Sequence, residues 1–109
     1  MHQRILHTIV CLACCTFGMS ALAHDSTAHY MANEGLMVEH GDTKILFDPL
    51  FRNAYGHYLL LPESMKKALF AGEPPYDDVD AVFISHHHGD HFDPTDVLNL
   101  MKMQTSIQL

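Results

Sequence analysis

The chain has 109 residues and a formal net charge of −7 at pH 7, with 48% hydrophobic and 17% charged residues. That length fits one small domain, and the composition is typical of a folded chain rather than a disordered one. The acidic balance argues against a nucleic-acid partner, which requires a basic surface.

The first 23 residues have the pattern of a secretory signal peptide. A single arginine precedes a mostly apolar stretch, residues 5–19, and Ala21 and Ala23 form the small-residue pattern at which signal peptidase cleaves. We therefore expect residues 1–23 to be removed, His24 to begin the mature protein, and the protein to be periplasmic or secreted. An uncleaved membrane anchor is the alternative, but the apolar stretch is shorter than the roughly 20 residues that a membrane-spanning helix needs.

All three cysteines lie inside this segment, at Cys11, Cys14 and Cys15. The mature chain therefore has none, which excludes a disulfide scaffold and a cysteine-ligated zinc site. Lipid attachment at Cys14 is a poor alternative, because Cys11 stands where such sites usually carry an aliphatic residue. Any metal must be bound by histidine and carboxylate ligands.

A hairpin is predicted near the start of the mature chain. Residues 24–29 are polar and are expected to form a loose terminus, and residues 30–47 read as strands. Within them, the apolar runs 36–40 and 43–47 flank a Gly-Asp pair, which is typical of two strands joined by a tight turn. Pro49 ends the second strand because it lacks a backbone donor.

A helix and a short strand follow. Pro62 precedes a predicted helix over residues 63–70, and Gly72 ends it. Residues 80–85 form an apolar run without polar alternation, which is typical of a strand buried on both faces.

A second helix is predicted after position 93, with Asp93 or Thr95 as its cap. The tail, residues 104–109, is polar and shows no clear stop. The residues expected to form the apolar face of this helix are Val97, Leu98, Leu100 and Met101.

The segment between the short strand and the second helix is rich in metal ligands. Imidazole nitrogen and carboxylate oxygen are donors that zinc and similar divalent metals prefer, and a solvated histidine-rich loop is the alternative interpretation. Four imidazoles and one carboxylate fall within six positions: His86, His87, His88, Asp90 and His91.

The spacing of these residues predicts two neighbouring metal pockets. Side chains two apart on an extended chain point to the same side, so His86 and His88 are expected to converge on one ion while His87 points away. Gly89 permits a tight turn, after which Asp90 and His91 face a second ion. Two-metal hydrolases hold their ions about 3.5–4 Å apart, and water bridging the ions loses its proton near neutral pH and becomes the nucleophile.

The pattern His86-x-His88-x-Asp90-His91 after an apolar strand resembles the signature of the metallo-β-lactamase superfamily. Residues 41–49 are similar to the early strand-and-Asp segment of its lactonase-like and phospholipase-like branches, so that the resemblance covers roughly residues 29–101. It implies a four-layer αββα sandwich, of which residues 24–109 would form an incomplete N-terminal part with mixed α/β (α+β) structure.

The resemblance also implies roles for these residues. His86 and His88 would ligate the first metal, and Asp90 and His91 the second, with Asp90 also the catalytic residue. Asp48 would be a structural residue near the site rather than a ligand. The implied cofactor is Zn²⁺, two ions in a complete site, although other divalent metals fit. The implied activity is hydrolysis of a small-molecule ester, lactone, amide or phosphodiester by metal-bound hydroxide.

The chain departs from the superfamily pattern downstream. Members take a third ligand for the first metal, a bridging aspartate and a last histidine from later segments, whereas no histidine follows His91 here. We therefore expect the chain to be the N-terminal portion of a family member. The alternatives are a non-catalytic secreted protein that binds zinc, and a chain whose site is completed by a partner polypeptide.

The remaining polar and aromatic candidates are interpreted as structural. We expect histidines outside the loop to lie at the surface or to be partly buried, acidic residues at the second helix to favour its start, and aromatic residues of the irregular segment to pack rather than line a substrate entrance. These are His29, His40 and His57, Asp93 and Asp96, and Phe51, Tyr55 and Tyr58.

Overall fold

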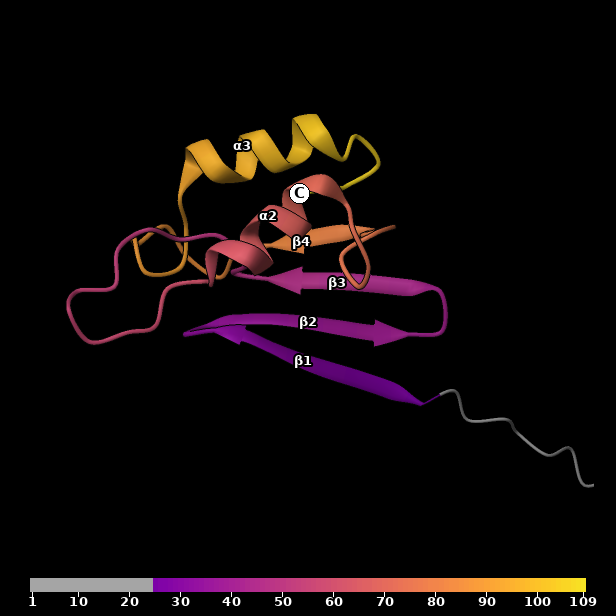
Figure 1. The fold of residues 1–109 in the computed structure, drawn as a ribbon, viewed down its shortest axis with the longest axis horizontal. Coiled ribbons are helices and arrows are strands. Elements are labelled where there is room, and N and C mark those ends of the chain that lie inside the picture. Colours follow the sequence, from indigo (N-terminus) through magenta and orange to yellow (C-terminus); the bar gives the residue numbers. More distant parts are fainter. Residues whose placement is uncertain (1–24) are drawn as a thin grey trace, which may run out of the picture.

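A computed structural model describes residues 25–109, so the predicted signal peptide lies outside the described residues. One mixed four-stranded sheet carries two helices on the same face (Figure 1). This small α+β unit confirms the predicted fold class and supplies two of the four layers implied by the resemblance. The elements are β1 (Ser26–Ala32), β2 (Gly35–His40), β3 (Thr43–Phe47), α2 (Glu63–Ala71), β4 (Ala81–Phe83) and α3 (Pro94–Met103).

The predicted hairpin is present as β2 and β3. The two strands pair antiparallel up to His40 opposite Thr43, and the two residues between them form the turn, with Gly41 at a φ of 57°. This backbone conformation favours glycine, since other residues meet a steric penalty there. The sequence therefore placed both strands and their turn correctly.

The predicted loose terminus at residues 24–29 is wrong from Ser26 onward. Residues 26–32 form β1, an edge strand that pairs antiparallel with β2. The first half of β1 lacks apolar alternation. It pairs with β2 through backbone hydrogen bonds and also through side-chain contacts. The His29 and Glu39 side chains lie 2.7 Å apart, and Ser26 bonds to the His40 ring at 2.7 Å.

The parallel pairing of β3 with β4 positions the candidate site. Phe47 lies opposite Phe83 in the register, and the backbone N–H of Asp48 donates to the carbonyl of Phe83 over 2.9 Å. The carboxyl ends of both strands therefore meet at one edge of the sheet. Asp48 and Ser85, which follow these ends, are neighbours although 37 positions separate them.

The hydrophobic core lies between the sheet and the helices. Met37, Leu46 and Val82 project from neighbouring strands and are buried together with Leu69 of α2 and Leu100 of α3. Burial of such side chains is the main favourable term in folding.

The opposite face of the sheet is exposed, and Phe47 and Phe83 stack on it with ring centroids 5.5 Å apart. Phe83 is 53% exposed, so the prediction that its strand is buried on both faces is wrong. The helices cover only one face of the described sheet (Figure 1).

The two helices begin and end largely as predicted. Helix α2 follows Pro62 and ends at Gly72, whose φ of 63° is the left-handed conformation common at helix ends. Helix α3 is capped by Asp93, which accepts a hydrogen bond from the backbone of Asp96 at 2.8 Å. None of the helices in residues 25–109 has the length and hydropathy of a membrane-spanning segment.

Two details of the C-terminal region differ from the prediction. Leu98 is 56% exposed, because successive helical residues are about 100° apart and its neighbour Val97 faces the core. The tail contributes to the fold: Ile107 is buried, and Gln108 exchanges backbone hydrogen bonds with Asp80 and Val82 at the outer edge of β4.

A buried carboxylate connects the helices to the irregular segment. Asp96 is only 2% exposed and accepts hydrogen bonds from Arg52 and Lys66, each as short as 2.5 Å. The bond from Arg52 is the main cause that lowers the pKa of Asp96 below its usual value; Lys66 adds to this effect, and burial opposes it. The interpretation of Asp96 as a helix-start carboxylate therefore missed its main contacts.

Candidate metal site

The histidine-rich loop leaves the carboxyl end of β4 and is anchored at its first residue. The carboxylate of Asp48 accepts two hydrogen bonds from Ser85, one from its backbone N–H at 2.7 Å and one from its hydroxyl at 2.6 Å. Asp48 has a φ of 42° and is only 4% exposed, so it projects from the end of β3 into the base of the loop. One carboxylate thus ties the ends of two parallel strands together.

Asp48 also holds a histidine of the loop. Its Oδ2 lies 2.8 Å from Nδ1 of His91. Burial by itself raises the pKa of Asp48, but hydrogen bonds from His91 and Ser85 outweigh burial and hold this pKa below its usual value. Asp48 is therefore ionised at neutral pH and acts as an acceptor.

The contact with Asp48 determines which nitrogen of His91 faces the rest of the loop. An ionised carboxylate requires a proton on Nδ1, so in a neutral ring Nε2 carries the free lone pair. Nε2 lies 3.9 Å from Oδ2 of Asp90. A carboxylate bonded to the far nitrogen of a histidine is the usual support of a metal-ligating imidazole.

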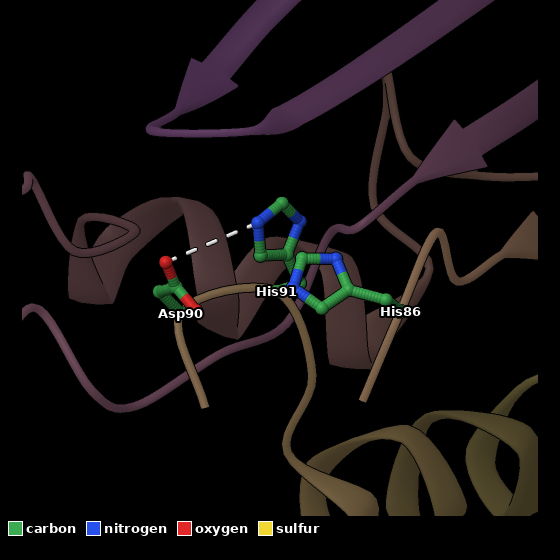
Figure 2. A group of neighbouring side chains, drawn as sticks. All are labelled: His86, Asp90 and His91. Atoms are coloured by element: carbon green, nitrogen blue, oxygen red, sulfur yellow. Dashed lines mark ion pairs between the residues drawn. The ribbon is translucent and has the colours of Figure 1, made fainter. Parts of the chain in front are cut away.

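Three potential ligands converge at this point. His86, Asp90 and His91 each offer a nitrogen or carboxylate oxygen, and these atoms all lie within 4.8 Å of one another. Figure 2 shows the rings of His86 and His91 beside each other, with the Asp90 carboxylate facing His91. The centroids of the two rings are 3.9 Å apart.

The other two histidines lie at the margin of this group. Nδ1 of His88 is 3.0 Å from Nε2 of His86, so these residues are adjacent, as expected from their spacing. His88 is not among the three residues whose ligand atoms converge. His87 is exposed and its ring lies 4.9 Å from that of His88. The arrangement brings His86 close to Asp90 and His91, whereas the spacing alone placed it in a separate pocket.

Two asparagines that the sequence analysis did not single out contact the loop backbone. The side-chain amide of Asn33 donates to the carbonyl of Asp90 at 3.2 Å, and the backbone N–H of Asn53 donates to the carbonyl of Gly89 at 3.1 Å. Asn33 follows β1 in a turn with a φ of 44°. An asparagine at a tight turn is a recognisable signal, but its long-range partner is not visible in the sequence.

Gly89 has a different role from the one expected. Its φ is not positive, so the turn does not require the conformational freedom of glycine. A Cβ at this position would lie 3.1 Å from the Cβ of Asn53. The absence of a side chain therefore allows the irregular segment to pack closely against the loop.

The donor set fits a divalent metal. Two imidazoles and one carboxylate match the three protein ligands of catalytic zinc sites, which leave a further position for water or substrate. His86 is exposed and Asp90 and His91 are partly buried, so the group is accessible from solvent. The structure thus provides a possible metal-binding group whose best-supported member, His91, is already oriented.

A shallow surface hollow of about 450 Å³ borders this group. His86 forms part of its wall, and the remaining lining is mainly apolar, including Val82, Ile84 and Phe92. The aromatic residues of the irregular segment do not line this hollow: Phe51 is buried, while Tyr55 and Tyr58 are exposed elsewhere.

Comparisons with known proteins give one match. The model of the metallo-beta-lactamase superfamily matches residues 35–92, which is more than half of the chain and includes β2, β3, β4 and the complete histidine-rich loop. Neither the search of curated proteins nor the search of solved structures gave a match. The extent of the family match, together with the position of the loop at the end of β4, shows that the chain belongs to the metallo-β-lactamase superfamily.

Proposed function

We propose that the loop from Ser85 to His91 binds zinc and that the chain carries part of the active site of a metal-dependent hydrolase. The observation that carries this proposal is the position of His91. Its Nδ1 is bonded to the buried Asp48 at 2.8 Å, and its Nε2 is directed towards Asp90 and the neighbouring ring of His86. A histidine held in this way is prepared to bind a cation through Nε2.

The residues of the chain suggest how hydrolysis would proceed. A divalent ion supplies positive charge that lowers the pKa of water and stabilises negative charge on the substrate. Asp48 keeps His91 in one tautomer. The Asp90 carboxylate, which is partly buried beside Nε2 of His91, accepts a proton from the attacking water. The water oxygen bonds to the carbonyl carbon or phosphorus, the bond to the leaving group breaks, and the leaving group departs with its electron pair and takes up a proton.

The surroundings of the site favour a small molecule with an apolar part. The mainly apolar hollow beside His86 would receive such a group next to the reacting bond. The net charge of −7 disfavours large polyanions such as nucleic acids. Esters, lactones, amides and phosphodiesters all remain in the proposed substrate class.

We also propose that the protein acts outside the cytoplasm, in the periplasm or as a secreted protein. The support is the sequence of residues 1–23 alone. Mass spectrometry of the full-length gene product, recovered from the extracytoplasmic fraction, would detect a chain that begins at His24. Recovery of only the uncleaved chain in the cytoplasm would overturn this part of the proposal.

A hydrolysis assay tests the proposed activity. The zinc-loaded chain would be incubated with a nitrophenyl ester, a lactone, a chromogenic β-lactam and a nitrophenyl phosphodiester, with and without a chelator. Because the chain carries only part of the site, we expect slow, chelator-sensitive turnover of at least one substrate, below about 1 s⁻¹. This turnover should be lost in His86→Ala and retained in His57→Ala, which alters an exposed histidine outside the ligand group. Zinc binding without turnover of any substrate would favour the non-catalytic zinc-binding alternative.

A further inference from the structure

The side chain of Asn33, in the β1–β2 turn, reaches the histidine-rich loop. Its Nδ2 donates a hydrogen bond to the main-chain oxygen of Asp90 at 3.2 Å, across a separation of 57 positions. The contact is partly buried, so solvent competes with it only in part. The turn between the edge strand β1 and its neighbour β2 is thereby connected to a proposed metal ligand.

The hydrogen bond from Asn33 is to the main chain of Asp90, and the carboxylate of Asp90 itself makes few polar contacts. Within residues 25–109 its polar interaction is the ion pair with His91, at the long distance of 3.9 Å. The backbone on both sides of Asp90 is better held, because Gly89 bonds to Asn53 at 3.1 Å and the N–H of His91 bonds to His88 at 2.9 Å. The position of the carboxylate therefore depends on where the main chain places it.

We propose that Asn33 is a positioning residue for Asp90, and that through this hydrogen bond it sets the affinity of the site for its metal. The inference rests on the proposed metal site. His91 is oriented by Asp48 through its ring, whereas Asp90 is oriented by Asn33 through its carbonyl. Two adjacent ligands are thus each held by a residue from a distant turn or strand end.

The chemistry of the position favours asparagine. The φ of 44° at Asn33 lies in the left-handed region, which glycine, asparagine and aspartate tolerate best. Of these three, only asparagine has a side-chain N–H that can donate to a carbonyl oxygen. Glycine would retain the turn but has no side-chain amide to donate. Aspartate would retain the shape of the side chain but place a carboxylate oxygen against the carbonyl oxygen of Asp90.

These properties define the variants for a test in the full chain. Asn33→Gly removes the amide while preserving the backbone conformation, and Asn33→Asp is nearly isosteric. Asp78→Gly is the matched control, since Asp78 has a similar φ of 51° in an exposed turn that belongs to none of the site contacts. Binding of Zn²⁺ would be measured by competition with a chelating dye, and binding of Co²⁺ by its visible absorption spectrum. Thermal unfolding of each metal-free chain would be measured in parallel.

We expect Asn33→Gly and Asn33→Asp to weaken zinc binding about 10- to 100-fold, the range found when residues that support metal ligands are replaced. The Co²⁺ spectrum should change, whereas metal-free Asn33→Gly should unfold only a few degrees below Asp78→Gly, because it also loses one partly buried hydrogen bond. In an Asp90→Asn background, Asn33→Gly should change the affinity less than about twofold, because the ligand that it positions is already altered.

Distinct outcomes would overturn the inference. Unchanged affinity and an unchanged Co²⁺ spectrum in both Asn33 variants, with normal binding by the wild-type chain, would overturn the role of Asn33 and leave the proposed function intact. An equal loss of affinity with and without Asp90→Asn would show that Asn33 acts on the fold in general. Absence of metal binding by the wild-type chain would overturn the proposed function and this inference with it.

Discussion

Oδ2 of Asp48 and Nδ1 of His91 lie 2.8 Å apart, although 43 positions separate the two residues. The contact exists because β3 and β4 are parallel neighbours, so Asp48 at the end of one strand meets the loop that follows the other. It leaves Nε2 of His91 directed towards Asp90. A core carboxylate thereby determines the orientation of a candidate metal ligand.

Replacement of Asp48 by asparagine should lower the affinity of the site for zinc. Asparagine retains tolerance of the φ of 42° and can still accept a hydrogen bond from Ser85, but it lacks the charge that fixes the tautomer of His91. We expect zinc affinity to fall about 10- to 100-fold, as measured by competition with a chelating dye.

Ser85→Ala provides the comparison for this variant. It removes one hydroxyl, which donates to Asp48 at 2.6 Å and also lies 3.1 Å from Nδ1 of His91, but it leaves the closer contact of Asp48 with His91 in place. The affinity of this variant should lie closer to that of the wild type. Equal zinc affinity in Asp48→Asn and the wild-type chain would contradict the proposed role of Asp48.

Asp96 should contribute stability that depends on pH. Its pKa is lowered, chiefly by the hydrogen bond from Arg52, with a further contribution from Lys66. A carboxyl whose pKa is lower in the folded state stabilises the protein above its unfolded pKa of about 3.9, and this contribution is lost as the pH falls through the lower folded value. Asp96→Asn should therefore cost about 2–3 kcal/mol at pH 7, since hydrogen bonds to charged groups are lost.

Urea unfolding at pH 7 and near pH 3 would measure this effect. The difference in unfolding free energy between wild type and Asp96→Asn should shrink at the lower pH. The exposed Asp78→Asn should change stability by less than about 0.5 kcal/mol at pH 7. A difference for Asp96→Asn that is equally large at both pH values would show that charge is not the cause.

Gly89→Ala should destabilise the contact between the loop and the irregular segment. The added Cβ would lie 3.1 Å from that of Asn53, so one of the two segments must shift by a few tenths of an ångström. We expect a loss of about 1 kcal/mol in unfolding free energy, at the lower end of the overpacking range. Because the clash is with the Cβ of Asn53, the substitution should cost less in an Asn53→Gly background. An equal loss of unfolding free energy with and without Asn53→Gly would show that the contact with Asn53 is not the cause.

The sequence predicted those strands and helices whose formation depends on residues close together in the chain. The hairpin of β2 and β3 follows from two apolar runs around a turn, and α2 follows from Pro62 and Gly72 at its ends. The first part of strand β1, residues 26–29, was missed because it is polar, has no apolar alternation and depends on pairing with β2. The exposed position of Phe83 was missed because a short apolar run does not reveal whether one or both faces are covered.

Three of the four candidate ligands predicted from sequence, His86, Asp90 and His91, converge in the structure, whereas most of the contacts that hold them were not predicted. The density of histidine after an apolar strand pointed to the loop, and the resemblance pointed to Asp48 as a structural residue. The contacts of Asn33 with Asp90 and of Asp96 with Arg52 link residues 57 and 44 positions apart. Such pairs depend on how the strands and loops meet in space, which no local pattern in one sequence records.

The amount of zinc bound by the purified full chain tests the central claim most directly. After zinc loading and dialysis, the wild-type chain and the His57→Ala control should each retain at least about one ion per chain by elemental analysis, because His57 lies outside the converging group. His86→Ala and His91→Ala should retain much less, since each loses one of three donors. Less than one ion per chain in the wild type, or retention that neither substitution at His86 nor at His91 changes, would contradict the claim that this loop is a metal site.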